Sequence, residues 1–149
     1  AIEMKKKIGC HVIASDVDKN ICMLARKNIK FNNLNIKVYQ SNFFKNIKQS
    51  FDIVSFNPPY VATSLGKKIL LSKKFKSQWD GGKNSDRVLK SFLNKLKNYN
   101  KKIICYMGIN RQHLDTKAIQ KLIKNYKLNL IEMKKSNLFP VNVYIVKNK

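Results

Sequence analysis

The sequence predicts an α/β fold in which a mostly parallel β-sheet ends in an antiparallel hairpin. Short apolar stretches alternate with segments of helical periodicity, which is typical of parallel strands joined by helices. The last two apolar stretches have no helix between them, so we expect them to pair as a hairpin. With 149 residues, 44% of them hydrophobic, the chain is long enough for one compact core, and we expect a single domain.

The first elements form a strand–helix–strand unit. Residues 11–15 are a short apolar run that ends at Asp16. From Asp18 a helical pattern of apolar residues runs to a stop at Asn32-Asn33, and residues 36–40 then alternate as a strand.

The later elements continue the alternation of strands and helices. Residues 51–56 are a nearly continuous apolar run, which predicts a buried strand. The remaining predicted elements are a helix over 86–96, a buried strand over 103–109, a helix with apolar positions from 119 to 126, and hairpin strands over 128–134 and 141–147 around a turn at 137–140.

The chain is strongly basic. It has 31 Lys and Arg against 8 Asp and Glu, a formal net charge of +23, which suggests a polyanionic partner such as nucleic acid. Only three of these residues are arginine, however, and sites that read bases favour arginine. The even spread of lysine, asparagine and isoleucine is also what an AT-rich genome would produce, so both interpretations stay open.

Nothing in the sequence predicts a membrane span, a secretion signal or a metal site. No run approaches the roughly 18 apolar residues of a membrane helix, and we expect a cytoplasmic protein. Cys10, Cys22 and Cys105 are widely spaced and form no C-x-x-C pair, so we expect buried thiols rather than disulfides or metal ligands. His11 and His113 lack the partner spacing of a metal site or catalytic triad, and we expect structural roles.

Two polar residues directly follow predicted strands. Ligands of such sheets bind beyond the carboxyl ends of the strands, where Asp16 and Asn57 are expected. A carboxylate at this position commonly accepts hydrogen bonds from both ribose hydroxyls of a nucleotide. The alternative is that Asp16 or Asp18 only caps the following helix.

The segment Asn57-Pro58-Pro59-Tyr60 predicts the catalytic residues. Its prolines fix the backbone and remove two N–H donors, so the turn offers acceptors beside an aromatic ring. Asn57 Oδ1 and the Pro58 carbonyl can each accept one hydrogen of a planar NH2 group, while the Tyr60 ring packs on its flat face. These hydrogen bonds localise the nitrogen lone pair and direct it at an electrophile. The alternative is a proline-rich turn that only ends the strand.

Three segments resemble a known family. The run D-I-V-x-x-N-P-P-Y at residues 52–60 resembles the signature of class I S-adenosylmethionine-dependent methyltransferases that modify planar nitrogens. These include adenine-N6 DNA methyltransferases and HemK-type glutamine methyltransferases. Residues 79–85 resemble the W-x-G-G-x-x-G segment of the eukaryotic and archaeal HemK-type branch, and residues 14–28 its T-D-I-N-x-x-A segment. The resemblance implies a Rossmann-like class I methyltransferase fold.

The resemblance also implies a cofactor and the residues that bind it. S-adenosylmethionine would place its ribose hydroxyls on Asp16 and its adenine on Val17. Asn42 falls where the family usually has an aspartate that accepts from the adenine amino group, with Phe43 as its apolar neighbour. Asn57 would contact both the cofactor and the substrate.

The resemblance implies a second set of residues for the substrate. These are Asn57, Tyr60, Trp79, Gly81 and Gly82. Trp79 is either a wall of the acceptor pocket or an ordinary core residue. Ser85 stands where the family usually has glycine, which puts the conformation of this loop in question.

The implied reaction is N5-methylation of the glutamine in the Gly-Gly-Gln motif of a class I translation termination factor. The resemblance further implies a small zinc-containing activator protein as a partner. Alternatives are a nucleic-acid methyltransferase acting on an exocyclic amine, either adenine N6 or guanine N2, methylation of a protein lysine, and a noncatalytic remnant that only binds a partner. The lysines at 67–68 and 73–76 are either solvated or contact an acidic protein or RNA.

One part of the family pattern is absent. The family's first strand and its E-x-G-x-G-type loop would lie immediately before Ala1, and residues 1–10 resemble the helix that follows them. We therefore expect a domain over residues 1–149 that is incomplete at its N-terminus. The missing strand would be central, between the strands that end at Asp16 and Phe56, and the assigned function belongs to the complete protein.

Overall fold

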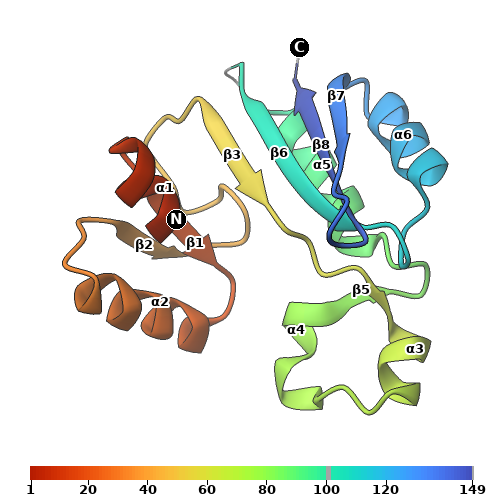
Figure 1. Ribbon diagram of the computed structural model, residues 1–149, viewed down its shortest axis with the longest axis horizontal. Coiled ribbons are helices and arrows are strands. Elements are labelled where there is room, and N and C mark those ends of the chain that lie inside the picture. The colour runs from red at the N-terminus through yellow and green to blue at the C-terminus, as the bar shows by residue number, and fades with distance from the viewer. Residues whose placement is uncertain (100–101, 149) are drawn as a thin grey trace. The chain divides into compact units, whose positions relative to one another are not determined.

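The computed structural model describes residues 1–99 and 102–148, which divide into two compact units, residues 1–49 and 50–149 (Figure 1). Each unit combines strands and helices, which agrees with the predicted α/β class. Within the described ranges, no helix has the length and apolar character needed to cross a membrane.

The first unit is a β–α–β unit preceded by a helix. Its elements are α1 (Ile2–Ile8), β1 (Ile13–Asp16), α2 (Lys19–Phe31) and β2 (Lys37–Gln40). β1 and β2 pair in parallel, with Asp16 opposite Gln40, so both strands end at the same edge. The Asp18 side chain caps α2 by accepting from the N–H of Asn20 at 2.8 Å, which confirms the predicted start of this helix. Val12, Ile29 and Ile36 form the buried core of the unit.

The second unit contains a four-stranded sheet in the order β3-β6-β8-β7. Its strands are β3 (Ile53–Phe56), β6 (Ile104–Asn110), β7 (Asn129–Lys135) and β8 (Val141–Lys147), and its long helices are α5 (Arg87–Lys97) and α6 (Thr116–Asn125). β3 and β6 are parallel, whereas β8 is antiparallel to both β6 and β7, so the predicted terminal hairpin is confirmed.

The core of the second unit lies between apolar helix faces and one face of this sheet. Alternate residues of β6 are fully buried, because successive side chains of a strand point to opposite faces. The buried set from the two helices and the sheet includes Leu89, Phe92, Leu93, Leu96, Cys105, Met107, Ile109, Ile119, Ile123, Tyr144 and Val146.

The segment between β3 and α5 contains elements that the periodicity does not predict. They are β4 (Val61–Ala62), α3 (Thr63–Lys68), a 3-10 turn η1 (Lys73–Phe75), α4 (Lys76–Trp79) and β5 (Asp80–Gly82). β4 and β5 pair in parallel as a separate two-stranded sheet.

The burial of β3 differs from the prediction of a buried strand. Ile53 is 51% exposed and Ser55 is also exposed. β3 stands at the end of the strand order and has β6 as its neighbour in the sheet, so its apolar composition does not guarantee burial. Cys22 and Cys105 are buried as predicted, whereas Cys10 is half-buried.

Candidate active site

The acceptor turn, defined as residues 57–60, leaves the end of β3 and leads directly into β4. At its start, the Phe56 ring stacks on Phe92 of α5, with ring centroids 4.1 Å apart. Phe92 is only 1% exposed, so the end of β3 is anchored in the core. At its other end, β4 is paired with β5. The turn is therefore held by ordered structure on both sides.

The acceptor atoms of this turn are available to a ligand. Pro58 is buried and Pro59 half-buried, whereas Asn57 is exposed. Within the described part of the chain, neither the Asn57 side chain nor the Pro58 carbonyl forms a hydrogen bond. Both oxygens can thus accept hydrogens from another molecule, which is the property the sequence predicted for them.

The Tyr60 ring lies against a residue that the sequence did not associate with it. Its centroid is 5.7 Å from that of the His113 imidazole, and the two planes are inclined by 25°. His113 lies in the loop that follows β6, the parallel neighbour of β3. The imidazole therefore restricts the position of the Tyr60 ring at the carboxyl end of the sheet.

A buried carboxylate links β4 to β5. Asp80 is 5% exposed, and its Oδ1 accepts hydrogen bonds from the Thr63 hydroxyl and, at 2.9 Å, from the N–H of Gly82. Its Oδ2 lies 3.4 Å from Lys76 Nζ and 3.8 Å from Arg87 Nη2. Because Thr63 follows β4 directly, its hydrogen bond to Asp80 holds β4, the strand after the acceptor turn, against β5.

These contacts determine the ionisation of Asp80. Burial by itself would raise the pKa of the carboxyl group, since it disfavours the charged form. The hydrogen bonds from Thr63 and Gly82 and the Lys76 ammonium outweigh this effect, and the pKa of Asp80 lies below its ordinary value. Asp80 is therefore a carboxylate at neutral pH.

The conformation of the chain around β5 and the loop after it accounts for the glycines at positions 81 and 82. A Cβ on Gly81 would lie 2.5 Å from the Ser85 carbonyl oxygen, and Gly82 has a φ of +89°. Ser85, which stands in place of the family's usual glycine, is buried and has a φ of +63°. This left-handed conformation favours glycine, so the loop keeps its bend although Ser85 carries a side chain.

Trp79 packs within the same region. Its ring fills the space beside Gly66 of α3, where an added Cβ would lie 2.1 Å from Trp79 Cζ3. Its indole N–H donates to the Ser72 carbonyl at 3.0 Å. Trp79 thus joins α3 to the following loop, and its predicted contact with a substrate stays a prediction.

The first unit contains four of the residues predicted to bind the cofactor, whereas the fifth, Asn57, belongs to the second unit. The Asp16 side chain accepts from the N–H of Asp18 through Oδ1 at 2.9 Å. Its Oδ2 forms no hydrogen bond to any described residue. The helix cap is Asp18 and not Asp16. Binding of ribose hydroxyls by Asp16 stays a prediction. Val17 is 56% exposed beside Asp16.

Asn42 and Phe43 lie at the same edge, directly after β2. The N–H of Ser41 donates to the Asp16 carbonyl at 2.8 Å, which fixes this turn beside the end of β1. The Ser41 hydroxyl donates to the Phe43 carbonyl at 2.8 Å, and Phe43 has a φ of +53°. Asn42 is exposed. The unit therefore brings Asp16, Val17, Asn42 and Phe43 together.

The structure groups the predicted residues in two sets, one in each unit. The second set contains the acceptor turn and, through the β4–β5 pair, the Trp79–Gly82 motif. Sequence reasoning missed Thr63, Asp80 and His113. Asp80 lies inside the 79–85 segment that resembles the family, and the signal for it was a charged residue between a tryptophan and two glycines. No sequence pattern pointed to His113. Among the described residues, no group of His, Cys, Asp and Glu could hold a metal ion.

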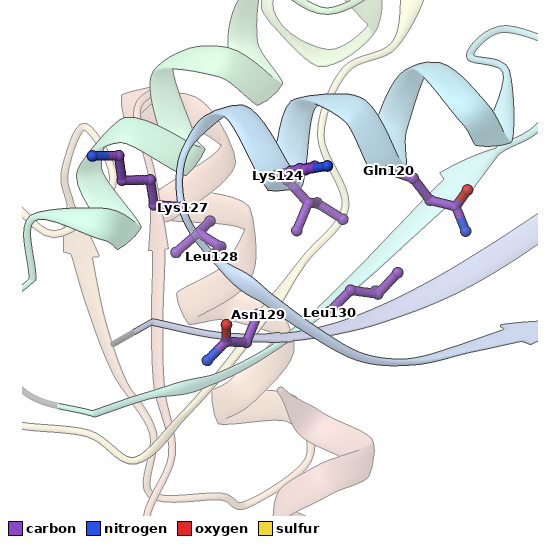
Figure 2. Close-up of a pocket in the computed structure, with 7 residues that line it drawn as sticks. Gln120, Lys124, Lys127, Leu128, Asn129 and Leu130 are labelled. Atoms are coloured by element: carbon purple, nitrogen blue, oxygen red, sulfur yellow. The ribbon is translucent and has the colours of Figure 1, made fainter.

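A groove of about 590 Å³ lies elsewhere in the second unit, between α6 and the start of β7 (Figure 2). It is lined by Gln120, Ile123, Lys124, Lys127, Leu128, Asn129 and Leu130. β7 begins opposite the end of β8, whereas the acceptor turn is near the start of β8, so the groove is not part of the candidate active site.

Comparison with known proteins identifies a family and related sequences. The family "Methyltransferase small domain" matches residues 1–78. A protein of Methanocaldococcus jannaschii, provisionally named a protein N5-glutamine methyltransferase, is 37% identical over 102 residues, which are 68% of this chain and 51% of that protein. A release factor glutamine methyltransferase of Haemophilus influenzae is 37% identical over 57 residues, 38% of this chain and 20% of that protein. The chain spans about half the length of the first relative and about a fifth of the second.

Solved structures share the fold at low sequence identity. A methyltransferase from Pyrococcus furiosus matches 98% of this chain and 66% of its own, with a TM-score of 0.67 and 16% identity. An S-adenosylmethionine-dependent methyltransferase from Clostridium acetobutylicum matches 93% of this chain and 75% of its own, with a TM-score of 0.59 and 13% identity. The predicted class I methyltransferase fold is confirmed.

Proposed function

The chain belongs to the methyltransferase small domain family, with relatives of the HemK type, and from this membership we propose that the complete protein methylates a glutamine side chain. The methyl donor we propose is S-adenosylmethionine. The glutamine we propose is that of the Gly-Gly-Gln motif in a class I translation termination factor, in line with the name of the Haemophilus influenzae relative.

The availability of the acceptor atoms carries this proposal. Asn57 is exposed, and its Oδ1 and the Pro58 carbonyl form no hydrogen bond within the described residues, while the turn itself is anchored through Phe56, Tyr60 and β4. A glutamine amide is planar and has two N–H groups, so it matches two fixed carbonyl acceptors beside an aromatic ring. A lysine ammonium is not planar, and its nitrogen has no delocalised lone pair that the two acceptors would have to localise. It therefore matches the acceptor turn less well than a glutamine amide does.

The first unit supports S-adenosylmethionine as the donor. At the carboxyl end of β1, Asp16 Oδ2 forms no hydrogen bond to a described residue, so this carboxylate suits ribose hydroxyls. The exposed Val17 offers an apolar surface for an adenine ring, and Asn42 can accept from an exocyclic amine through Oδ1. These residues fit the adenosine portion of the donor.

The chemical role of the acceptor turn follows from its geometry. S-adenosylmethionine supplies an electrophilic methyl group when bound. Asn57 Oδ1 and the Pro58 carbonyl accept the two amide hydrogens, which withdraws the nitrogen lone pair from amide resonance and orients it. The nitrogen loses one hydrogen as a proton when the new N–C bond forms. Because neither carbonyl is basic enough to retain it, the proton passes to water, which reaches the exposed Asn57.

Labelled methyl transfer with the complete protein tests the proposal. The acceptors are the termination factor with Gly-Gly-Gln intact, the same factor with Gly-Gly-Ala, RNA and DNA. We expect label only in the intact factor, and a loss of about a hundredfold or more in kcat for Asn57→Ala. Label that persists in the Gly-Gly-Ala factor would refute the proposal.

The net charge of +23 favours one other candidate, a nucleic-acid methyltransferase that acts on an exocyclic amine. Such an amine is also a planar NH2 group and would suit the same acceptors. Label in RNA or DNA, sensitive to salt, would support this candidate instead. The zinc-containing activator, the single domain and the additional central strand stay predictions for the complete protein.

A further inference from the structure

The turn between β7 and β8 displays two large apolar side chains to solvent. We call residues 136–140 the hairpin tip. Leu138 is 87% exposed and Phe139 is 66% exposed. Exposure of two adjacent residues of this size is unfavourable in water and is typical of a surface that another molecule covers.

The backbone of the hairpin tip is held in place. The Ser136 hydroxyl accepts from the N–H of Phe139 at 3.1 Å, and the N–H of Val141 donates to the Phe139 carbonyl at 2.7 Å. Arg111, at the end of β6, donates through Nη1 to the carbonyls of Ser136 and Phe139 at 3.5 and 3.3 Å, and its own N–H donates to the Pro140 carbonyl at 2.8 Å. A fixed conformation lowers the entropic cost of binding.

The hairpin tip lies at the same end of the sheet as the acceptor turn (Figure 1). Val141 pairs with Asn110, the last residue of β6, and β6 runs parallel to β3, which ends at the acceptor turn. The loop after β6 contacts both features, since Arg111 holds the tip and His113 stacks on Tyr60. A protein that inserts a glutamine at Asn57 would therefore have surface near the tip.

The charge around the hairpin tip indicates which kind of partner surface would fit it. Residues 133–149 contain no Asp or Glu, whereas Lys135 and Arg111 are exposed. The nearest acids along the chain are engaged, since Asp115 caps α6 and Glu132 pairs with Lys134 at 3.6 Å. Leu138 cannot stack on bases as the aromatic residues of RNA-binding surfaces do, so a protein is the better match.

We propose that the hairpin tip is a docking element that inserts Leu138 and Phe139 into an apolar patch, rimmed by acidic groups, on the protein whose glutamine is methylated. This proposal rests on the proposed function. It adds a contact remote from the reacting amide, which contributes to binding of the whole factor and not to the chemistry of its glutamine.

The test compares a protein acceptor with a short one. The L138S/F139S variant and the wild type, both as the complete protein, methylate either the intact termination factor or a short peptide that contains its Gly-Gly-Gln motif. We expect KM for the factor to rise about tenfold, with kcat changed by less than about twofold. Both constants for the peptide stay unchanged, because the peptide lacks the patch.

Phe31→Ser is the matched control, because Phe31 is 87% exposed on the first unit. It leaves both constants unchanged for both acceptors, and the thermal midpoints of the two variants match the wild type.

Two outcomes would overturn the docking proposal: KM for the factor is unchanged, or the peptide is affected as strongly as the factor. If KM for the factor is unchanged and the tip is needed for sedimentation with vesicles of phosphatidylglycerol and phosphatidylcholine, the tip binds a lipid surface instead. Failure of the proposed function is distinct, because the wild type itself then transfers no label to the factor.

Discussion

Replacement of Asp80 measures how strongly the β4–β5 pair is held. Asp80→Ala removes a charged acceptor from the Thr63 hydroxyl and from the N–H of Gly82. Hydrogen bonds to a charged group contribute about 1.5–3 kcal/mol each, and release of the carboxylate from its buried site offsets part of that loss. Lys76 and Arg87 are 54% and 67% exposed, so their ion pairs add about 1 kcal/mol or less. We expect the free energy of unfolding to fall by about 3 kcal/mol.

Urea denaturation followed by the fluorescence of Trp79, the single tryptophan of the chain, provides the assay. Asp86→Ala is the matched control, because Asp86 also pairs with a lysine four residues away, at 2.8 Å from Lys90. Asp86 lacks the Thr63 and Gly82 contacts, so its replacement costs about 1 kcal/mol or less. A similar loss for the two variants would refute the role assigned to Asp80.

The pH dependence of this difference has a definite sign. Since the pKa of Asp80 is lower in the folded state than its ordinary value of 3.8, the folded state binds this proton less readily than the unfolded state. The stabilisation by Asp80 is therefore complete above about pH 5 and decreases as the pH falls through 3.8 and below. A wild-type advantage that grows toward acidic pH would contradict the hydrogen-bonded carboxylate.

Three further predictions concern the packing of the second unit. Ser85→Gly relieves a φ of +63° and raises the free energy of unfolding by about 0.5–1 kcal/mol in urea denaturation. Gly66→Ala places a Cβ 2.1 Å from Trp79 Cζ3, so it lowers that free energy by about 1–3 kcal/mol and shifts the Trp79 emission. Gly108→Ala, where the nearest atom is 4.0 Å away, changes neither. Burial raises the pKa of Cys105 to about 12, so mass spectrometry at pH 8 shows slow alkylation by iodoacetamide in the folded protein and fast alkylation in urea.

The sequence predicts the elements whose residues repeat with a clear period. The α2 helix, the parallel strands and the terminal hairpin all follow from apolar spacing and from caps such as Asp18, because these signals are local. β4 and β5 have two and three residues, too few for a period. Their pairing depends on contacts across the chain, chiefly Thr63 with Asp80, which no local pattern encodes.

In the candidate site, too, the sequence predicted the features that depend on a local motif and missed the contacts between distant positions. The motif predicted the acceptors of Asn57 and Pro58, which form no hydrogen bond to the residues that the structure describes. The departure at Ser85 marked a position where the backbone has a positive φ. The contact of Tyr60 with His113 joins positions 53 residues apart in the chain, counted as 113 − 60, through the pairing of β3 with β6. Burial of β3 was predicted wrongly, because an apolar run indicates a strand and leaves its number of neighbours undetermined.

In the proposed reaction the acceptor turn contributes only weak chemistry, and this makes the residues that support it important. An amide oxygen and a main-chain carbonyl are poor bases, so their effect on a bound amide depends on orientation more than on proton affinity. The supports are Phe92 beneath Phe56, His113 beside Tyr60 and Asp80 behind β4. Replacement of any of them leaves both carbonyl oxygens present but loosens their positions. We therefore expect these residues to affect kcat although they contribute no reacting atom, and a variant that destabilised the β4–β5 pair without lowering kcat would contradict this view of the turn.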